Sequence, residues 1–468
     1  MVTTFLRLLL FSGFLVISTI CQATEATDSK QLSTKIPIIH IAAANLAPLD
    51  IGLEIGRQSK KYFADIERRY DSYLMASLSQ MGFDDMLRDR LPGLRNTIDT
   101  SYQKELEGVA SAWSLTHDNK LGDGFLSWDE YWLLNLLPDI GLPANGTGFG
   151  ILSQLSKEKG TIVGRNLDLK STPSLRSLQA ITVYQYADYA VVNIGFAGIV
   201  SVLTGFNESG LFVAHFNAAS DSSYQNPYRV RENTNKDVQA QGFILRKALE
   251  TLTTTQKAIN FIAKNSDGIS NNTLVADKKY IQILEYSAAG KTTIRRWNSQ
   301  THPGKRWNRK SQIAVVDCHV LNSMSDNCIR AKDSYRWERL RSLAVFTDMN
   351  KAGVQDIARI MLDNNNKYYE ILSANTLQSM IYLPGSGHLY LYAAPINNSA
   401  GDNTGIPPFY QVYYQDLIPS ELRKPRNKTR YFWWIAGLLI LLLFSLWMIR
   451  RSVNKNETNS KRLFGYIK

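Results

Sequence analysis

The hydrophobic pattern of the chain changes near Phe149, and this change restricts the possible folds more than any other feature. Between Leu49 and Gly141, apolar residues recur every three to four positions, which is typical of amphipathic helices. After the change, short apolar runs alternate with turns rich in Gly, Asp and Asn, which indicates antiparallel strands. Helical spacing returns in four segments, Phe243–Leu252, Gln256–Ala263, Ser334–Phe346 and Val354–Leu362. Helices combined with a large antiparallel sheet predict a layered α+β domain.

The predicted strands are short apolar runs bounded by turn residues. They lie at Phe149–Leu152, Thr161–Val163, Ala180–Tyr186, Tyr189–Ile194, Ile199–Leu203, Leu211–Phe216, Asn272–Ala276, Tyr280–Tyr286, Thr292–Trp297, Ile313–Val316, Gln378–Tyr382 and His388–Ala394. Because 44% of the chain is hydrophobic, it has enough apolar material to bury a sizeable core between such layers.

The N-terminal segment predicts secretion. Met1–Ala23 has one cation, Arg7, followed by an apolar run and a small final residue, as in a signal peptide cleaved after Ala23. An uncleaved signal anchor is an alternative. A lipoprotein acylated at Cys21 is a second alternative, although the bulky Ile20 fits the required cleavage motif poorly.

A second apolar segment, Tyr431–Ile449, contains nineteen residues and no charge. At about 1.5 Å per residue, it is long enough to cross a hydrocarbon core of about 30 Å as a transmembrane helix. Tryptophans lie near both of its ends, as at membrane interfaces. Together with the signal, it predicts a single-pass membrane protein. Residues 24–430 would face the periplasm or another extracytoplasmic space, and the tail 450–468 would be cytoplasmic.

The net charge of +12 is concentrated around this second segment. Residues 423–468 hold eleven Lys or Arg and one acid, Glu457, so they contribute +10 and the remaining 422 residues contribute +2. A nucleic-acid-binding domain would carry its basic residues on the folded surface. We therefore expect the lipid bilayer as a partner, and no nucleic acid.

The motifs give no indication of a metal or a cofactor, and we expect neither. Asn119–Glu130 approaches a calcium loop, but Leu121 occupies a position that needs an oxygen ligand. A polar loop followed by an N-cap at Ser127, with Glu130 three residues later, is the preferred interpretation. The six histidines are scattered without an i,i+4 pair, which argues against a zinc site. A Ser-His-Asp triad stays open, because triads are not local in sequence.

Three cysteines are too few for a disulfide-dense scaffold or a multi-cysteine zinc module. Cys318 and Cys328 are the two that remain after signal cleavage. In an oxidising compartment, the simplest prediction is a disulfide that closes the short loop between them.

Six stretches together carry a family resemblance. They are Asp50–Gln58 (DIGLEIGRQ), Tyr102–Trp113 (YQKELEGVASAW), Leu126–Leu137 (LSWDEYWLLNLL), Gly160–Asp168 (GTIVGRNLD), Gly205–Asn217 (GFNESGLFVAHFN) and Asp333–Leu340 (DSYRWERL). Their order and spacing resemble the penicillin acyltransferase-like family, peptidase family C45. That family is related to the bile-salt hydrolases, penicillin V acylases and acid ceramidases among the N-terminal nucleophile (Ntn) hydrolases. The resemblance runs from about Leu49 to Pro395.

The resemblance implies a four-layer αββα fold and a reaction on amide or ester bonds of acylated small molecules. In such enzymes a chain cut exposes a Cys, Ser or Thr, and its own α-amine serves as the base. The resemblance places Arg165, Asp168, Asn217 and Arg336 in the catalytic site, with Asn217 as an oxyanion-binding amide. We expect Asp168 to orient the new amine and Arg165 to hold Asp168 ionised through a bidentate contact.

The chain departs from the family at the nucleophile. The family reads roughly Gly-Cys-Thr/Ser-x-Phe where this chain reads NGTGF over residues 145–149, so Gly146 stands at the nucleophilic position. Cys318 stands where the family has an oxyanion-binding Asn. In one interpretation Thr147 is the nucleophile, although a one-residue shift along a strand turns the side chain to the opposite face. In the other, the domain binds an acyl ligand or a protein partner without catalysis.

These patterns predict an ordered set of segments along the chain. They are a signal peptide (1–23), a linker (24–48), a propeptide-like helical region (49–145), an Ntn-hydrolase-like core (146–396), a juxtamembrane segment (397–430), the transmembrane helix (431–449) and the tail (450–468).

Overall fold

The computed structural model describes residues 35–140, 142, 144–218, 240–266, 269–288, 290–328, 331–364, 368–397, 409–417 and 443–448. Met1–Leu417 form one compact unit and Ile418–Lys468 form a second. In the second unit the structure describes residues 443–448, which are helical. The account below concerns the first unit.

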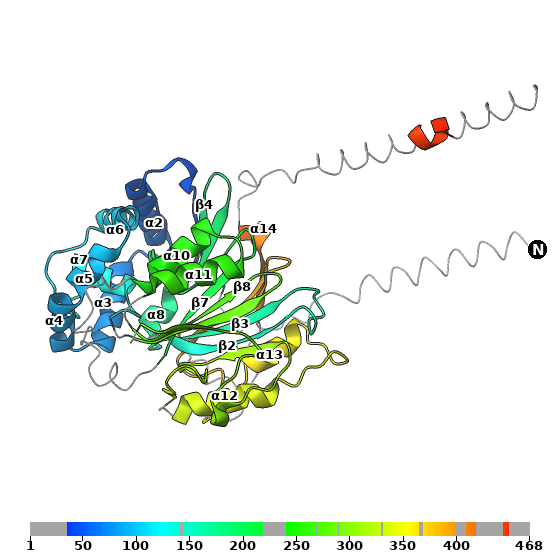
Figure 1. Cartoon of the computed structure of the whole chain (residues 1–468). Coiled ribbons are helices and arrows are strands. Elements are labelled where there is room, and N and C mark those ends of the chain that lie inside the picture. Colours follow the sequence, from blue (N-terminus) through cyan, green and yellow to red (C-terminus); the bar gives the residue numbers. More distant parts are fainter. Residues whose placement is uncertain are drawn as a thin grey trace, which may run out of the picture. The chain divides into compact units, whose positions relative to one another are not determined.

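Two β-sheets form the centre of the first unit (Figure 1). The eight-stranded sheet has the order β1 (Ile38–Ile41), β4 (Gln179–Gln185), β5 (Ala190–Phe196), β6 (Thr204–Asn207), β7 (Phe212–Asn217), β8 (Asn271–Ala276), β9 (Ile281–Tyr286) and β10 (Thr292–Arg295). The six-stranded sheet has the order β11 (Gln312–Val315), β2 (Asn145–Ile151), β3 (Ile162–Asp168), β12 (Thr376–Leu383), β13 (His388–Ala393) and β14 (Tyr410–Tyr413). The pairing of β1 with β4 is parallel, and the other pairings are antiparallel.

Helices cover the outer faces of both sheets, as Figure 1 shows. Apolar residues of α10 (Gln241–Thr251) and α11 (Thr255–Asn265) share a core with the eight-stranded sheet. Apolar residues of α12 (Ala331–Leu343) and α13 (Val354–Met361) share a core with the six-stranded sheet. The short elements are η1 (Ala43–Asn45), α8 (Pro173–Ser177), η2 (Pro303–Lys305) and α14 (Tyr414–Leu417).

The two sheets pack face to face. The rings of Phe206 in β6 and Tyr382 in β12 stack with 4.3 Å between their centroids. Gln378 Nε2 in β12 donates to Gly195 O in β5 at 2.9 Å. The order of layers is therefore helix, sheet, sheet, helix, which agrees with the predicted α+β sandwich.

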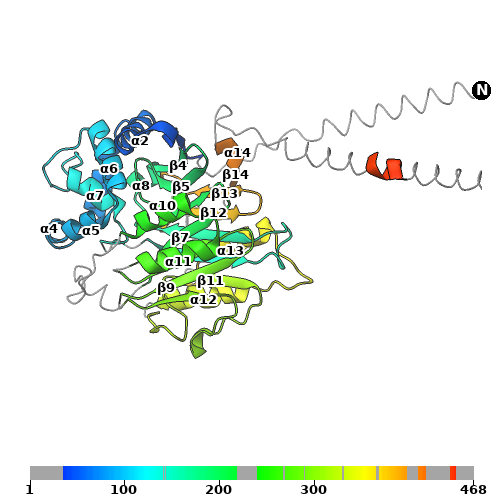
Figure 2. The ribbon, with the colours of Figure 1, turned by 45° about the horizontal axis from the view of Figure 1, so that its top comes forward.

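A group of N-terminal helices lies at one end of the sandwich (Figure 2). They are α2 (Pro48–Tyr62), α3 (Ile66–Ser77), α4 (Gln80–Asp89), α5 (Leu91–Thr97), α6 (Thr100–Trp113) and α7 (Trp128–Asn135). Their buried residues belong to the same hydrophobic core as the eight-stranded sheet. A buried ion pair also joins them to the sheet layer, because the Arg246 guanidinium of α10 donates to both Glu105 oxygens of α6 at 2.6 and 3.0 Å. The predicted boundary at residue 145 does not separate two compact units.

The structure corrects three other sequence-based predictions. The predicted linker 24–48 contains β1, which pairs with β4, and the juxtamembrane segment 397–430 contains β14, which pairs with β13. The predicted strand Ile199–Leu203 is irregular, and the backbone N–H groups of Val200 and Ser201 bond to Asn135 Oδ1 instead of to a neighbouring strand.

The interpretation of the loop before α7 is confirmed. The Ser127 hydroxyl accepts from Glu130 N, and the Glu130 carboxylate accepts from Ser127 N, so the two residues form a capping box. The backbone N–H groups of Gly122 and Gly124 donate to the two oxygens of Asp71. The described part of the chain has no group of three or more His, Cys, Asp or Glu side chains placed to hold a metal ion.

The predicted membrane segments lie mostly beyond what the structure describes. The signal 1–23 falls outside the described residues, as does 431–449 apart from 443–448. Among the helices that the structure describes, none combines the length and the apolar character that a membrane span needs.

Candidate functional site

Gly146 is the second residue of β2 and has a backbone conformation that only glycine adopts readily. Its φ is +144°, in the region that side-chain-bearing residues avoid. A Cβ at this position would overlap the carbonyl oxygen of Asn166 on β3 and approach the Arg165 guanidinium. Its N–H donates to Asp317 Oδ1 at 2.8 Å. The residue that the resemblance aligned with the nucleophile therefore lacks a side chain and also has no space for one.

Thr147 points to the opposite face of the same strand. A Cβ on its neighbour Gly148 would meet Phe216 and Leu274 of the other sheet, so even-numbered positions of β2 face the space between the sheets. Thr147 therefore faces the layer of α12 and α13, where its cross-strand partner Asn166 donates to Met361 O at 2.7 Å. The Thr147 hydroxyl is fully buried and has no hydrogen-bond partner among the described residues.

Asp168, at the end of β3, is the centre of a buried ion network. Its Oδ2 lies 2.8 Å from a terminal nitrogen of Arg336 on α12, and its Oδ1 accepts from the Thr376 hydroxyl at 2.6 Å. The other terminal nitrogen of Arg336 lies 3.9 Å from Asp317 Oδ2. Burial acts to lower the pKa of Arg336, but the two carboxylates outweigh this effect and raise it. The network therefore holds charged groups at the start of β2, next to Gly146 N.

Arg165 is near this network but has different partners from those predicted. Its guanidinium donates to three backbone carbonyl oxygens, those of Asn145 (3.1 Å), Asn166 and His215 (2.7 Å). It also lies over the Phe216 ring, 4.0 Å from the centroid. Burial lowers the pKa of Arg165 to about 10, although the Asp317 and Asp168 charges oppose this shift.

The expected bidentate contact between Arg165 and Asp168 is therefore wrong, and Arg336 takes that place. The reason is the alternation of side chains along β3. Arg165 lies opposite Gly148, on the face toward the second sheet, while Asp168 lies at the strand end within reach of α12.

Asn217, at the end of β7, is bound to the backbone just before β2. Its side-chain Oδ1 accepts from Ala144 N at 2.6 Å, and its backbone N–H donates to Ala144 O at 3.1 Å. Asn217, the predicted oxyanion donor, therefore contacts Ala144, which precedes Gly146 by two residues. Its side-chain oxygen is occupied by the hydrogen bond from Ala144 N.

A cavity of about 570 Å³ opens beside the ion network. Asp168 and Arg336 line it, whereas Thr147, Arg165 and Asn217 do not. The other lining residues are Tyr73, Ser77, Leu142, Asn145, Leu169, Lys170, Asp317, Lys332, Asp333 and Asn375. Two of the five predicted site residues therefore meet at one cavity.

Sequence reasoning missed Asp317, which contacts both Gly146 and Arg336. The signal was present, because Asp317 directly follows the predicted strand Ile313–Val316.

The loop that carries Asp317 is fastened on both sides. The predicted disulfide is confirmed, since Cys318 and Cys328 are bonded. Asn272 of β8 donates from Nδ2 to Val316 O and to Cys318 O, at 2.9 Å each. These two bonds fix the carbonyl groups on either side of Asp317, so its carboxylate is aimed at Gly146 N.

A family model decides the relationship of this chain to known proteins. The model described as acyl-coenzyme A:6-aminopenicillanic acid acyl-transferase matches residues 155–395, which is half of the chain. The chain belongs to this acyltransferase family. Its members and relatives are hydrolases and acyltransferases that act on amide bonds. The match covers Arg165, Asp168, Asn217 and Arg336, and it begins after Thr147.

Solved structures of Ntn hydrolases are similar to the chain at low identity. An N-acylethanolamine-hydrolyzing acid amidase ortholog from Caenorhabditis elegans has 14% identity and a TM-score of 0.37, covering 51% of this chain and 93% of its own. A mutant conjugated bile acid hydrolase from Clostridium perfringens has 13% identity and a TM-score of 0.34, covering 60% and 99%. Penicillin V acylase from Agrobacterium tumefaciens has 11% identity and a TM-score of 0.34, covering 58% and 87%. A search of curated proteins by sequence gives no significant match.

Proposed function

We propose that this chain hydrolyses or transfers the acyl group of an acylated small molecule that binds in the cavity beside Asp168. The observation that carries the proposal is the buried Asp168–Arg336–Asp317 network at the start of β2, open to a cavity of about 570 Å³. Buried charges cost desolvation energy, and a cluster of them beside a cavity is typical of a functional site. The family's amide-bond chemistry supports the same assignment.

The proposed reaction first needs hydrolysis of the peptide bond between Gly146 and Thr147, in which water adds its oxygen to the Gly146 carbonyl carbon and the Thr147 nitrogen is released. The cut gives Thr147 an α-amine, and it releases the strand end from the glycine-specific backbone. The amine then takes the hydroxyl proton while the hydroxyl oxygen attacks the acyl carbon. The leaving amine or alcohol departs with that proton, and water or an acceptor amine resolves the acyl-enzyme. The freed end must also turn, because in the intact strand Thr147 faces α12 and α13.

That last requirement favours a second function, which is binding of an acylated ligand without turnover. In the intact chain, Gly146 has no space for a side chain, and the Thr147 hydroxyl is buried on the face away from the second sheet. The ion network and the cavity need neither residue, so ligand binding survives without a nucleophile.

Thr147→Val decides between the two functions. The change removes a hydroxyl with no partner and keeps the side-chain volume, so the protein is expected to fold normally. Thr204→Val is the matched control, because Thr204 is a buried strand threonine whose hydroxyl also lacks a partner. We would measure the intact mass and the hydrolysis of fatty-acyl 4-nitroanilides of several chain lengths.

The enzyme proposal expects two fragments that meet at Gly146/Thr147, turnover by the wild type and by Thr204→Val, and none by Thr147→Val. A single uncut chain that binds the anilides, equally well with and without the Thr147 hydroxyl, would replace it by the binding function.

We also propose that the domain is anchored in a membrane and faces away from the cytoplasm. The signal-like segment 1–23 and the uncharged segment Tyr431–Ile449 support this proposal. In that arrangement the cavity would receive extracytoplasmic acylated molecules.

A further inference from the structure

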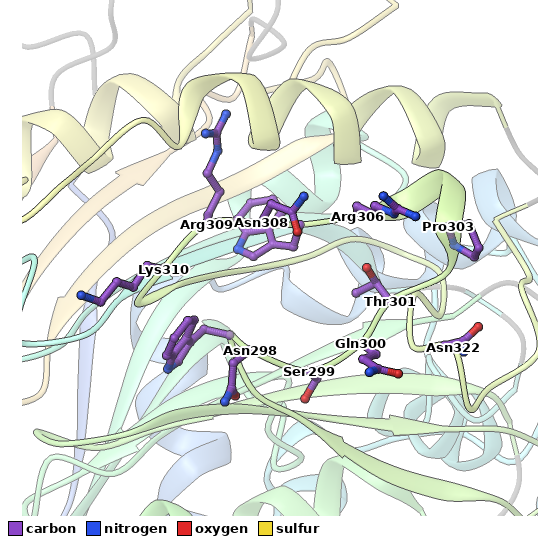
Figure 3. A pocket seen from close by; sticks show the side chains of 12 residues that line it. Asn298, Ser299, Gln300, Thr301, Pro303, Arg306, Asn308, Arg309, Lys310 and Asn322 are labelled. Carbon is purple, nitrogen blue, oxygen red and sulfur yellow. The ribbon is translucent and has the colours of Figure 1, made fainter.

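A second cavity, of about 650 Å³, lies apart from the ion network (Figure 3). It is bounded mainly by the connection between β10 and β11, and it shares no lining residue with the Asp168 cavity. As Figure 3 shows, the segment with Asn298, Ser299 and Gln300 forms one side, and the segment from Arg306 to Lys310 forms the other.

Contacts with the hydrophobic core and with α12 fix the position of the loop that lines the cavity. Trp307 is buried, its indole N–H donates to Gln312 O at 2.7 Å, and its ring lies 4.9 Å from that of Trp337. The Arg309 guanidinium donates twice to Arg341 O at the end of α12, at 2.9 and 3.1 Å. The opposite side is fixed by a bridge between Thr301 and Leu321. Both sides are therefore preformed.

The charged side chains that line this cavity are all cationic. The lining contains three cations and no acidic residue, together with six neutral amide or hydroxyl side chains. Among the described residues, the exposed Arg306 side chain has no hydrogen-bond or ion-pair partner. The half-buried Trp297 ring likewise has no aromatic or hydrogen-bond partner there. Within the part of the chain that the structure describes, the Lys310 side chain contacts one partner, Asp348, in an exposed ion pair of 3.4 Å. An exposed pair of this kind exchanges readily for a ligand anion.

We infer that this cavity binds an acidic carbohydrate, a sugar ring that carries a carboxylate or a phosphate. An unpaired guanidinium matches the geometry of either acidic group. Amide side chains both donate and accept, as vicinal hydroxyl groups require. The free face of Trp297 offers an apolar platform for one face of the ring. A nucleotide fits less well, because the second tryptophan, Trp307, is already covered by Trp337 and cannot complete a base-stacking pair.

The test titrates the full-length protein with glucuronate, glucose 6-phosphate, glucose and AMP, with binding followed by saturation-transfer NMR. We expect both acidic sugars to bind about tenfold or more tightly than glucose. Arg306→Gln should remove this preference, and Trp297→Ala should weaken both acidic sugars about tenfold. Arg296→Gln, an exposed arginine outside the lining, is the matched control and should leave binding unchanged.

Absence of binding by both acidic sugars would overturn the inference, and so would tighter binding of AMP than of glucuronate. Unchanged binding in Arg306→Gln would also overturn it, and this exposed substitution keeps the test valid even if Trp297→Ala fails to fold. Because none of these residues lines the Asp168 cavity, the outcome is independent of the proposed catalytic function.

Discussion

Gly146 determines which chemistry is possible at the start of β2. Its positive φ and the nearby Asn166 carbonyl oxygen both oppose a side chain. We therefore expect Gly146→Ala to lower the free energy of unfolding by about 1–3 kcal/mol, measured by urea denaturation. Gly146→Cys, which restores the family's residue, should be destabilised at least as much.

The matched control is Gly93→Ala, because a Cβ there meets nothing within 4 Å and the helix position favours alanine. A fully stable Gly146→Cys protein that hydrolyses acyl anilides would contradict the expectation and show that the strand start adapts to a nucleophile.

At the level of single residues, the sequence indicated which charged residues belong to the candidate site better than which of them form ion pairs with one another. Asp168 and Arg336, which the resemblance named as site residues, line one cavity. The sequence-based prediction paired Asp168 with Arg165, which is close in sequence, whereas the observed partner Arg336 lies on a distant helix. Contacts between elements depend on the sheet register, and no single motif carries that information.

At the level of elements, the N-terminus of α10 is capped by a distant carboxylate. Asp139, after α7, accepts from Gln241 N at 3.1 Å, while its second oxygen is buried without a partner. Burial raises the pKa of Asp139 to about 7, although the nearby Arg90 charge acts in the opposite direction. Between the unfolded pKa near 3.8 and the folded pKa near 7, the native protein binds more protons than the unfolded chain, so stability falls as pH rises.

The substitution Asp139→Asn should remove this loss of stability at high pH, because asparagine does not ionise. We expect the melting temperature of the wild type to fall from pH 5 to pH 8 relative to that of the variant, by an amount that corresponds to about 2–4 kcal/mol. Thermal denaturation at both pH values checks this, with the exposed Asp118→Asn as control. Parallel pH curves for wild type and variant would contradict the assigned pKa.

The sequence predicted most strands, including the edge strands β10 and β11, but it missed the edge strands β1 and β14 and the short inner strand β6. The predicted strand Asn272–Ala276 differs from β8 by one residue, because alternation within one buried strand is a local signal. Strands β1 and β14 were missed, since four residues beside polar stretches give too short a pattern. The irregular segment Ile199–Leu203 resembled a strand because its apolar residues are buried, but its backbone N–H groups at Val200 and Ser201 bond to Asn135 Oδ1.

At the level of the whole molecule, the helical region and the sandwich share one core. The Glu105–Arg246 pair that joins them is almost completely buried, with side-chain exposures of 4% and 0%. In Glu105→Gln, the buried Arg246 keeps Glu250 as an ion-pair partner at 3.0 Å, but it loses both of its hydrogen bonds to a charged carboxylate. We therefore expect Glu105→Gln to lower the free energy of unfolding by about 1–3 kcal/mol. Urea denaturation should still give a single transition, because the two regions unfold together.

Glu107→Gln, on the same helix, is the control. Its pair with Lys104 is largely exposed, so the change should cost less than about 0.5 kcal/mol. Two separate transitions in the wild type would show that the helices form an independent unit, and would contradict the shared core.

The proposed anchor makes a prediction about the orientation of the entire chain. Eleven basic residues flank Tyr431–Ile449, while the folded region is close to neutral. This distribution favours an interaction with lipid headgroups over binding of a polyanionic ligand by the folded domain. With a tag after Lys468, protease added to intact cells, with the outer membrane permeabilised where one exists, should remove the folded domain. It should leave a fragment of roughly 40–50 residues that carries the tag, because the bilayer protects the anchor and the tail.

The control is the same treatment after detergent, which should destroy the tag as well. A folded domain that stays intact until detergent is added would place it on the cytoplasmic side and refute the orientation. Release of the untreated protein by carbonate washing would refute the anchor itself.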